Sequence, residues 1–267
     1  MIDIGVNLSN PRFAEDIEQI LQRAQQAGIS KLVLTGTSVD ESRAVLALCK
    51  DYSETFPGML YATAGIHPHD AKTLDSESIY TLRELAAEPE VVAIGEMGLD
   101  FNRNFSTPAE QEKAFEAQLE LAVELQLPVF LHERDAAERQ LQILKAYRDY
   151  LVDAVAHCFT GSKQALFGYL DLNLHIGITG WICDKKRGEA LQQLVSNIPL
   201  ERLMVETDAP YLLPQNMLKP PKGKRNEPEF LPWVIEGVAA YRQESREQIA
   251  KATADNATRF FRLGQKL

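Results

Sequence analysis

Short apolar segments recur along this chain about every 25–35 residues, and each is followed by a segment with helical periodicity. The apolar segments, which we predict to be strands, are residues 2–8, 31–36, 61–66, 91–96, 128–131, 154–156, 174–178 and 203–206. The predicted helices are residues 11–27, 39–52, 74–88, 107–125, 135–150, 162–171, 186–196, 229–241 and 245–262. Strands that alternate with helices in this way indicate βαβ units and a parallel sheet.

The number of strand–helix units narrows the choice of fold. Eight units in 267 residues match a (β/α)8 barrel, a fold of typically about 250 residues. A doubly wound open sheet is the alternative, but no Gly-x-Gly-x-x-Gly sequence follows the first predicted strand. Because no Ser/Gly-rich linker interrupts the alternation, we predict an α/β protein with one (β/α)8 TIM-barrel domain over residues 1–267.

The composition is that of an ordinary globular protein, with 45% hydrophobic and 25% charged residues. No apolar run approaches the ~20 residues of a membrane span, and the first residues lack the basic and then apolar pattern of a signal peptide. The three cysteines form no Cys-x-x-Cys pair, which suits a reducing compartment. We therefore expect a cytoplasmic protein with no membrane partner. As a separate expectation, we take it to be a monomer.

The overall charge argues against a nucleic-acid partner, but its distribution does not. The net charge is −10, whereas phosphate binding requires Lys and Arg. Basic residues nevertheless gather after the seventh predicted strand, at 185–187, and after the eighth, where Lys222 and Lys224 lie. We expect these loops to form a basic rim for a phosphate backbone, and Trp181 to stack on bases. The alternatives are a solvated charge run and a rim-packing tryptophan.

Polar side chains gather at the ends of the predicted strands, where barrels carry their active sites. They are Asp3, Asn7, His67, His69, Glu96, Asp100, His132, Arg134, Asp135, His157 and Asp208. A carboxylate at the end of a buried strand costs several kcal/mol, roughly, unless a cation or hydrogen-bond donors meet it. Imidazoles and carboxylates from separate strands fit a divalent metal with open positions for water and substrate. This pattern favours a metal site that includes Glu96, His132, His157 and Asp208.

Several of these residues also have a purely structural interpretation. Asp3 is either a structural hydrogen-bond acceptor or a ligand, and Asp100 could cap a turn. His67 could contact substrate or make a structural hydrogen bond. We expect Cys158 to be a small buried apolar residue rather than a nucleophile.

Six ordered motifs resemble the TatD family of metal-dependent nucleases, whose members have an amidohydrolase-type barrel. The motifs are GIHPH at 65–69, GEMGLDF at 95–101, LHERDA at 131–136, HCFTG at 157–161, ETDAPYL at 206–212 and RNEP at 225–228. The resemblance covers about residues 3 to 260. It implies a 3′→5′ exonuclease acting on single-stranded DNA and also RNA, with a role in DNA repair or degradation.

The resemblance also implies roles for individual residues. Glu96, His132 and His157 would be metal ligands, and Asp208 a further ligand or the base that orients the attacking water. The implied substrate-side residues are His67, His69, Arg225, Asn226 and Glu227. The family suggests Mg²⁺, while imidazole ligands also suit Mn²⁺ or Zn²⁺.

The first predicted strand departs from the family pattern. Most members begin with Asp-x-His-x-His, which supplies two imidazoles to a second metal, but here those positions are Gly5 and Asn7. Glycine has no ligand atom, and Asn7 offers a neutral amide oxygen. We therefore expect one tightly bound ion and a second site that is weak or absent.

Two other functions are compatible with the same residues. The same metal and water could hydrolyse an amide or an aminoacyl ester, because a barrel fold does not choose the bond. A non-catalytic binding protein could also retain the barrel. The basic loops favour a phosphate substrate, and the four converging groups at positions 96, 132, 157 and 208 argue against a mere binding module.

Overall fold

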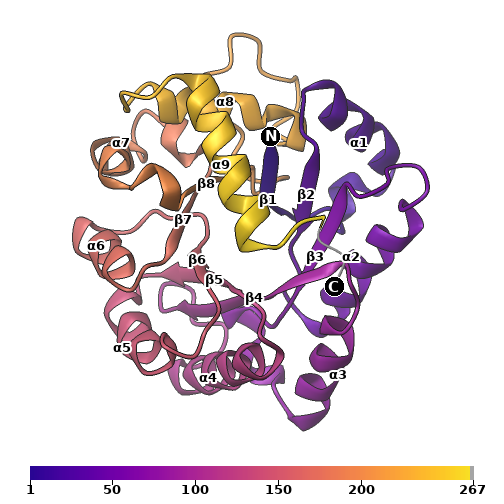
Figure 1. Ribbon diagram of the computed structural model, residues 1–267, viewed down its shortest axis with the longest axis vertical. Coiled ribbons are helices and arrows are strands. Elements are labelled where there is room, and N and C mark those ends of the chain that lie inside the picture. The colour runs from indigo at the N-terminus through magenta and orange to yellow at the C-terminus, as the bar shows by residue number, and fades with distance from the viewer. Residues whose placement is uncertain (265–267) are drawn as a thin grey trace.

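The computed structural model describes residues 1–264, and it confirms the predicted (β/α)8 barrel. Eight parallel strands pair in sequence order, and helices surround them (Figure 1). The strands are β1 (Ile2–Val6), β2 (Lys31–Leu34), β3 (Leu60–Ala64), β4 (Val91–Asp100), β5 (Val129–Arg134), β6 (Ala154–Ala156), β7 (His175–Ile178) and β8 (Leu203–Val205). The predicted single domain extends over 1–267, of which 265–267 lie outside the described residues.

The α-helices match the predicted helical segments closely. They are α1 (Ile17–Gln26), α2 (Val39–Asp51), α3 (Ser76–Ala86), α4 (Pro108–Leu125), α5 (Ala137–Tyr147), α6 (Lys163–Asp171), α7 (Glu189–Leu194), α8 (Leu231–Ala239) and α9 (Arg246–Phe260). Within residues 1–264, none of them is long and apolar enough to cross a membrane.

Most predicted boundaries differ from the observed ones by up to three residues, and the two larger differences have local causes. The predicted helix 11–27 begins at Ile17, because Asp16 at the N-cap has non-helical dihedrals and accepts hydrogen bonds from Arg23 and Arg225. Strand β4 continues past Glu96 to Asp100, because this extension pairs with the end of β5.

The barrel closes between β1 and β8 through few backbone contacts. Val6 and Ala209 form an isolated parallel bridge. Beside it, the buried carboxylate of Asp3 accepts hydrogen bonds from the backbone N–H of Thr207, at 2.9 Å, and from the Thr207 hydroxyl. Asp3 is therefore a structural acceptor that joins the first strand to the last.

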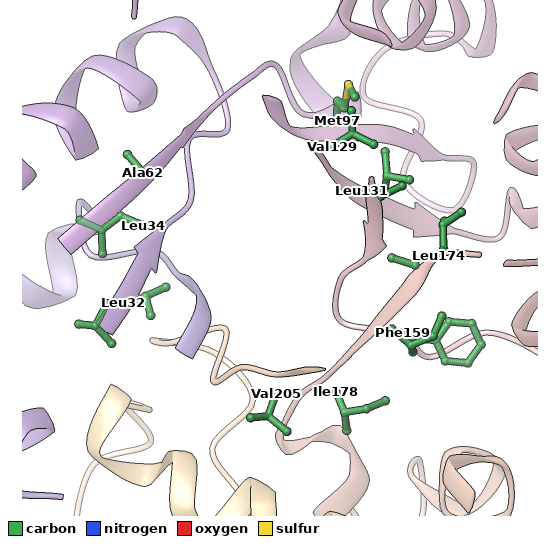
Figure 2. Packing of buried hydrophobic residues seen from close by; sticks show 14 of the residues in the cluster. Leu32, Leu34, Ala62, Met97, Val129, Leu131, Phe159, Leu174, Ile178 and Val205 are labelled. Atoms are coloured by element: carbon green, nitrogen blue, oxygen red, sulfur yellow. The ribbon is translucent and has the colours of Figure 1, made fainter. Parts of the chain in front are cut away.

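Side chains alternate between two apolar layers, one inside the barrel and one beneath the helices. Leu32 and Leu34 of β2 belong to the outer layer, while Val33 belongs to the inner one. Figure 2 shows members of the outer layer around the ring of strands. Phe260 and Phe261, at the end of α9, join the inner layer, and α9 lies across one end of the barrel in Figure 1. The carboxyl ends of the strands remain free for a site.

Buried glutamines fix the strand ends that carry functional side chains. Gln118 of α4 accepts from the Ile66 N–H at 2.7 Å and donates to the Ile66 carbonyl at 3.0 Å. Gln111 makes the same reciprocal pair with Asp100, at 2.8 and 3.0 Å. Both glutamines are fully buried. Each side-chain amide thus provides hydrogen-bond partners for the N–H and the carbonyl of one backbone residue, Ile66 or Asp100.

Replacing Gln118 tests this arrangement. A buried backbone group without a partner costs about 1–3 kcal/mol, so Gln118→Leu, which leaves two Ile66 groups unpaired, should lower the free energy of unfolding by about 2–5 kcal/mol. Urea unfolding followed by circular dichroism measures the difference. The control is Gln142→Leu at an exposed position of α5. Equal stability of the two variants would contradict the proposed role of Gln118.

Candidate metal centre

A cleft of about 780 Å³ opens at the carboxyl ends of the strands, and each of the eight strands contributes to its lining through its last residues or the segment after it. The predicted site residues that line it are His67, His69, Glu96, His132, His157, Trp181 and Asp208. Those that do not are Lys222, Lys224, Arg225, Asn226 and Glu227.

Glu96 lies at the centre of the predicted site, and three imidazoles face its Oε1. The ring nitrogens are His157 Nε2 at 2.8 Å, His132 Nδ1 at 2.9 Å and His67 Nε2 at 3.3 Å. Glu96 is 6% exposed. The buried charge that the sequence predicted at this strand end is therefore met by three nitrogens from three neighbouring strands or their ends.

This contact controls ionisation in the centre. Burial alone would raise the pKa of Glu96, but the facing imidazoles hold it well below its usual value. Burial would likewise lower the pKa of His157, and the carboxylates Glu96 and Glu206 raise it well above the ordinary value. Burial dominates at His67, whose pKa is lowered. The residues at the centre thus favour a carboxylate with at least one neutral imidazole beside it, a suitable donor set for a divalent cation.

The donor atoms are close enough to share one metal ion. One ligand atom from each of His67, Glu96 and His132 lies within 4.8 Å of the others. His132 Nε2 is buried and makes no hydrogen bond, although Asp100 Oδ2 is 3.5 Å away. A buried nitrogen without a donor or acceptor partner fits a ligand role. The residues therefore fit a divalent ion, and His67 lies within this group, while its predicted contact with substrate stays a prediction.

Asp100 supports the centre from the extended end of β4. Its Oδ2 lies 2.6 Å from His69 Nε2. Its Oδ1 accepts from the backbone N–H groups of Asn102 and Arg103, at 3.0 and 2.8 Å, so Asp100 does cap a turn. Burial opposes ionisation of Asp100, but the His132 imidazole and these donors hold its pKa far below the usual range.

Asp208 follows β8 in the left-handed backbone region, at φ 53°. Asn7 donates to its Oδ1 at 3.0 Å. Burial at the floor of the cleft raises the pKa of Asp208 to about 7, despite the opposing effect of the nearby His157. A carboxylate with this pKa can accept a proton at neutral pH.

Glu206 is a site residue that the sequence analysis did not single out. It is 0% exposed, and its Oε2 lies 3.2 Å from His157 Nδ1. Its Oε1 accepts from the Cys158 N–H. A β-carbon at Gly5 would overlap its Oε2, and one at Gly177 would lie 2.6 Å from Oε1. The carboxylate therefore occupies the space that Gly5 leaves, and a bond to Nδ1 orients His157 Nε2 toward Glu96. The available signal was a carboxylate directly after a buried strand.

The RNEP motif forms an ion-pair network beside α1. Arg225 pairs with Asp16 at 2.7 Å and with Glu227 at 2.6 Å. Its guanidinium lies 5.3 Å from the centre of the Phe13 ring. Asn226 is fully buried and donates to the Thr207 carbonyl at 2.9 Å. These contacts anchor the loop after β8, and substrate binding by residues 225–227 stays a prediction.

Two arginines contribute positive charge to the cleft itself. They are Arg103, after β4, and Arg134, at the end of β5. The Trp181 ring lies 4.4 Å from the Arg187 guanidinium and 5.8 Å from that of Arg134. Lys222 and Lys224 are exposed outside the cleft, and their predicted contact with substrate stays a prediction.

Related proteins share this sequence over its whole length. A protein of Musicola paradisiaca named "3'-5' ssDNA/RNA exonuclease TatD" is 49% identical over 100% of this chain and 99% of its own length. A protein of the same name from Yersinia pseudotuberculosis is 51% identical, over 98% of this chain and all of its own length.

Solved structures and a family profile show similarity to the same group of proteins. The crystal structure of the TatD homologue YJJV from Escherichia coli superposes with a TM-score of 0.87, at 31% identity and 98% coverage of both chains. A TatD-family hydrolase from Entamoeba histolytica gives 0.89 at 25% identity, over 98% of this chain and 97% of its own. The profile described as TatD related DNase matches residues 2–262. As the six motifs predicted, this chain belongs to the TatD-related DNase family.

Proposed function

We propose that this protein is a metal-dependent hydrolase of nucleic-acid phosphodiester bonds, a 3′→5′ exonuclease acting on single-stranded DNA and RNA. The observation that carries the proposal is the Glu96 carboxylate facing three imidazoles on the floor of a cleft that also holds two arginines. The names and full-length similarity of the relatives support the direction of cleavage and the substrate class.

The ion would be held by Glu96 and His132, with His67 and His157 as neighbouring imidazole donors and Asp208 as a further carboxylate. Family membership favours Mg²⁺, and the imidazoles also suit Mn²⁺ or Zn²⁺. When bound, such an ion supplies positive charge for the phosphoryl oxygens and makes a water molecule more acidic.

A single tightly held ion agrees with the surroundings of the first strand. Gly5 offers no donor, and the Glu206 carboxylate fills the space beside it while bonded to His157 and Cys158. The Asn7 amide is already used on Asp208. We therefore propose one tight site and a second that is weak or absent.

The protein's own residues would perform the proton transfer and the positioning. Asp208, with its pKa near neutrality, would accept the proton of the attacking water. Glu96 would keep the imidazoles and the ion in place. Arg103 and Arg134 would contact phosphate oxygens of the strand.

The other candidate functions are less well supported. An amide or aminoacyl-ester substrate gives the two cleft arginines no phosphate to bind, and a non-catalytic binding protein has no use for the converging imidazoles. The three free cysteines agree with a reducing cytoplasm, where a monomer would process nucleic-acid ends in repair or degradation.

A metal-screened assay tests this function. Purified protein with 5′-labelled single-stranded DNA should release nucleotides from the 3′ end when Mg²⁺ or Mn²⁺ is present and stop when EDTA is added. Glu96→Gln and Asp208→Asn should each lower kcat at least about 100-fold, because each removes an acid–base or ligand carboxylate. Asp255→Asn, an exposed change on α9, is the charge-matched control. The absence of metal-dependent cleavage with every ion would refute the proposal.

The salt dependence of cleavage tests where the nucleic-acid strand binds. Arg134→Ala should raise KM and reduce the slope of log(kcat/KM) against log salt by about 0.7, the value for one phosphate contact on a single strand. The double variant Lys222→Ala with Lys224→Ala tests the loop after β8 in the same way. An unchanged slope in the double variant would remove these lysines from the substrate-binding prediction. An unchanged slope in Arg134→Ala would contradict the cleft assignment.

A further inference from the structure

The cleft is electrostatically asymmetric across the metal centre. Its two arginines lie on one wall, Arg103 after β4 and Arg134 as the last residue of β5. Glu133 of β5 lines the cleft beside them. The wall built after β1 and β2 contributes hydroxyl groups and the carboxylate Glu41, and within residues 1–264 no Arg or Lys side chain lines this wall. Because the strands form a ring in sequence order, these two walls lie on different sides of the barrel mouth, with the Glu96 group on the floor.

Glu41 is held in position on the second wall. It lies in the first turn of α2, where its backbone N–H donates to the N-cap hydroxyl of Ser38 at 3.1 Å. The Ser9 hydroxyl donates to Glu41 Oε2 at 2.5 Å and so connects the loop after β1 to this helix. Across residues 1–264, no hydrogen-bond donor lies on Glu41 Oε1. One carboxylate oxygen therefore remains available to a ligand in the cleft.

The same wall is closed beside Glu41 by a second contact between loops. Asn10 Nδ2 donates to the Tyr211 hydroxyl at 3.2 Å, which joins the loops after β1 and β8. Both residues line the cleft. A nucleic-acid strand that enters the cleft over the arginines therefore meets, on the far side, loops that hydrogen bonds hold together.

The charges of the two walls determine how a nucleic-acid strand can lie in the cleft. Each internal nucleotide carries a phosphate, which Arg103 and Arg134 attract and which Glu41 repels. A nucleic-acid strand therefore meets the Glu41 wall most favourably with a part that has no phosphate. The terminal sugar is such a part, and its free hydroxyl groups are donors that a carboxylate oxygen can accept.

We propose that Glu41 is a specificity-determining residue that accepts a hydrogen bond from the free 3′-hydroxyl of the terminal nucleotide and excludes a 3′-phosphate. The inference rests on the exonuclease function proposed above and adds the chemical form of the strand end. The last phosphate of the strand, which links its final two nucleotides, then lies over the Glu96 group, so that one nucleotide is released per cut. A ribose terminus offers its 2′-hydroxyl to the same carboxylate, in agreement with cleavage of both DNA and RNA.

Two oligonucleotides of the same sequence, one ending in a 3′-hydroxyl and one in a 3′-phosphate, test this inference. The wild-type protein should prefer the hydroxyl end by at least about 100-fold in kcat/KM, an amount typical of a lost charge-assisted bond with added like-charge repulsion. Glu41→Gln should reduce this preference at least about tenfold, because the amide no longer repels phosphate. Asp40→Asn is the matched control, since Asp40 is the preceding residue of α2, its side chain is 94% exposed, and it lies outside the cleft.

The outcomes separate this inference from the proposed function. Cleavage of both oligonucleotides at equal rates by the wild-type protein would overturn the role of Glu41 and leave the exonuclease function in place. This comparison requires no variant, so it is independent of how Glu41→Gln folds. An unchanged preference in a Glu41→Gln protein with a wild-type melting temperature would also overturn the role. Failure to cleave either oligonucleotide with any metal would instead refute the exonuclease function itself.

Discussion

The buried carboxylate of Glu96 is the charge on which the rest of the site depends. An isolated carboxylate at this depth would be neutral, and the three imidazoles keep it ionised. Those imidazoles come from the ends of β3, β5 and β6, so their convergence on Glu96 of β4 requires that these strand ends are fixed relative to one another. The reciprocal amide bonds of Gln118 and Gln111 fix two such ends, and Asp3 joins the first strand to the last. These buried polar contacts therefore help to hold the imidazoles around the Glu96 carboxylate.

The seam between β1 and β8 shows how space left by one strand is used by a side chain from its neighbour. Gly5 has no side chain where the family pattern places an imidazole, and the carboxylate of Glu206, directly after β8, lies in this space. The carboxylate then orients His157 through Nδ1, while Asn7 donates to Asp208. The first strand thus supports the site through space and hydrogen bonding, without supplying an imidazole. This is the physical reason to expect one tight ion.

The sequence predicted the barrel and its central ligands because both depend on local patterns: periodic apolar segments, and polar residues directly after them. It did not reveal Glu206 as a neighbour of Gly5, because the contact joins positions some 200 residues apart. For the same reason, the pairing of Arg225 with Asp16 was not evident, although it interrupts the predicted first helix and removes Arg225 from the cleft lining. A run of charged residues in a sequence does not reveal whether their side chains will line the cleft or point away from it. Folding placed the cleft cations at positions 103 and 134 instead.

The central claim is that one divalent ion binds at the Glu96 carboxylate. Anomalous diffraction from crystals soaked in Mn²⁺ tests it most directly. We expect one strong peak within coordination distance of Glu96 Oε1, bordered by His67 and His132, and loss of that peak in Glu96→Gln crystals. A peak of equal height beside Asn7 would contradict the single tight site. A peak that persists in Glu96→Gln crystals, or the absence of any peak near Glu96, would contradict the assignment of the metal centre.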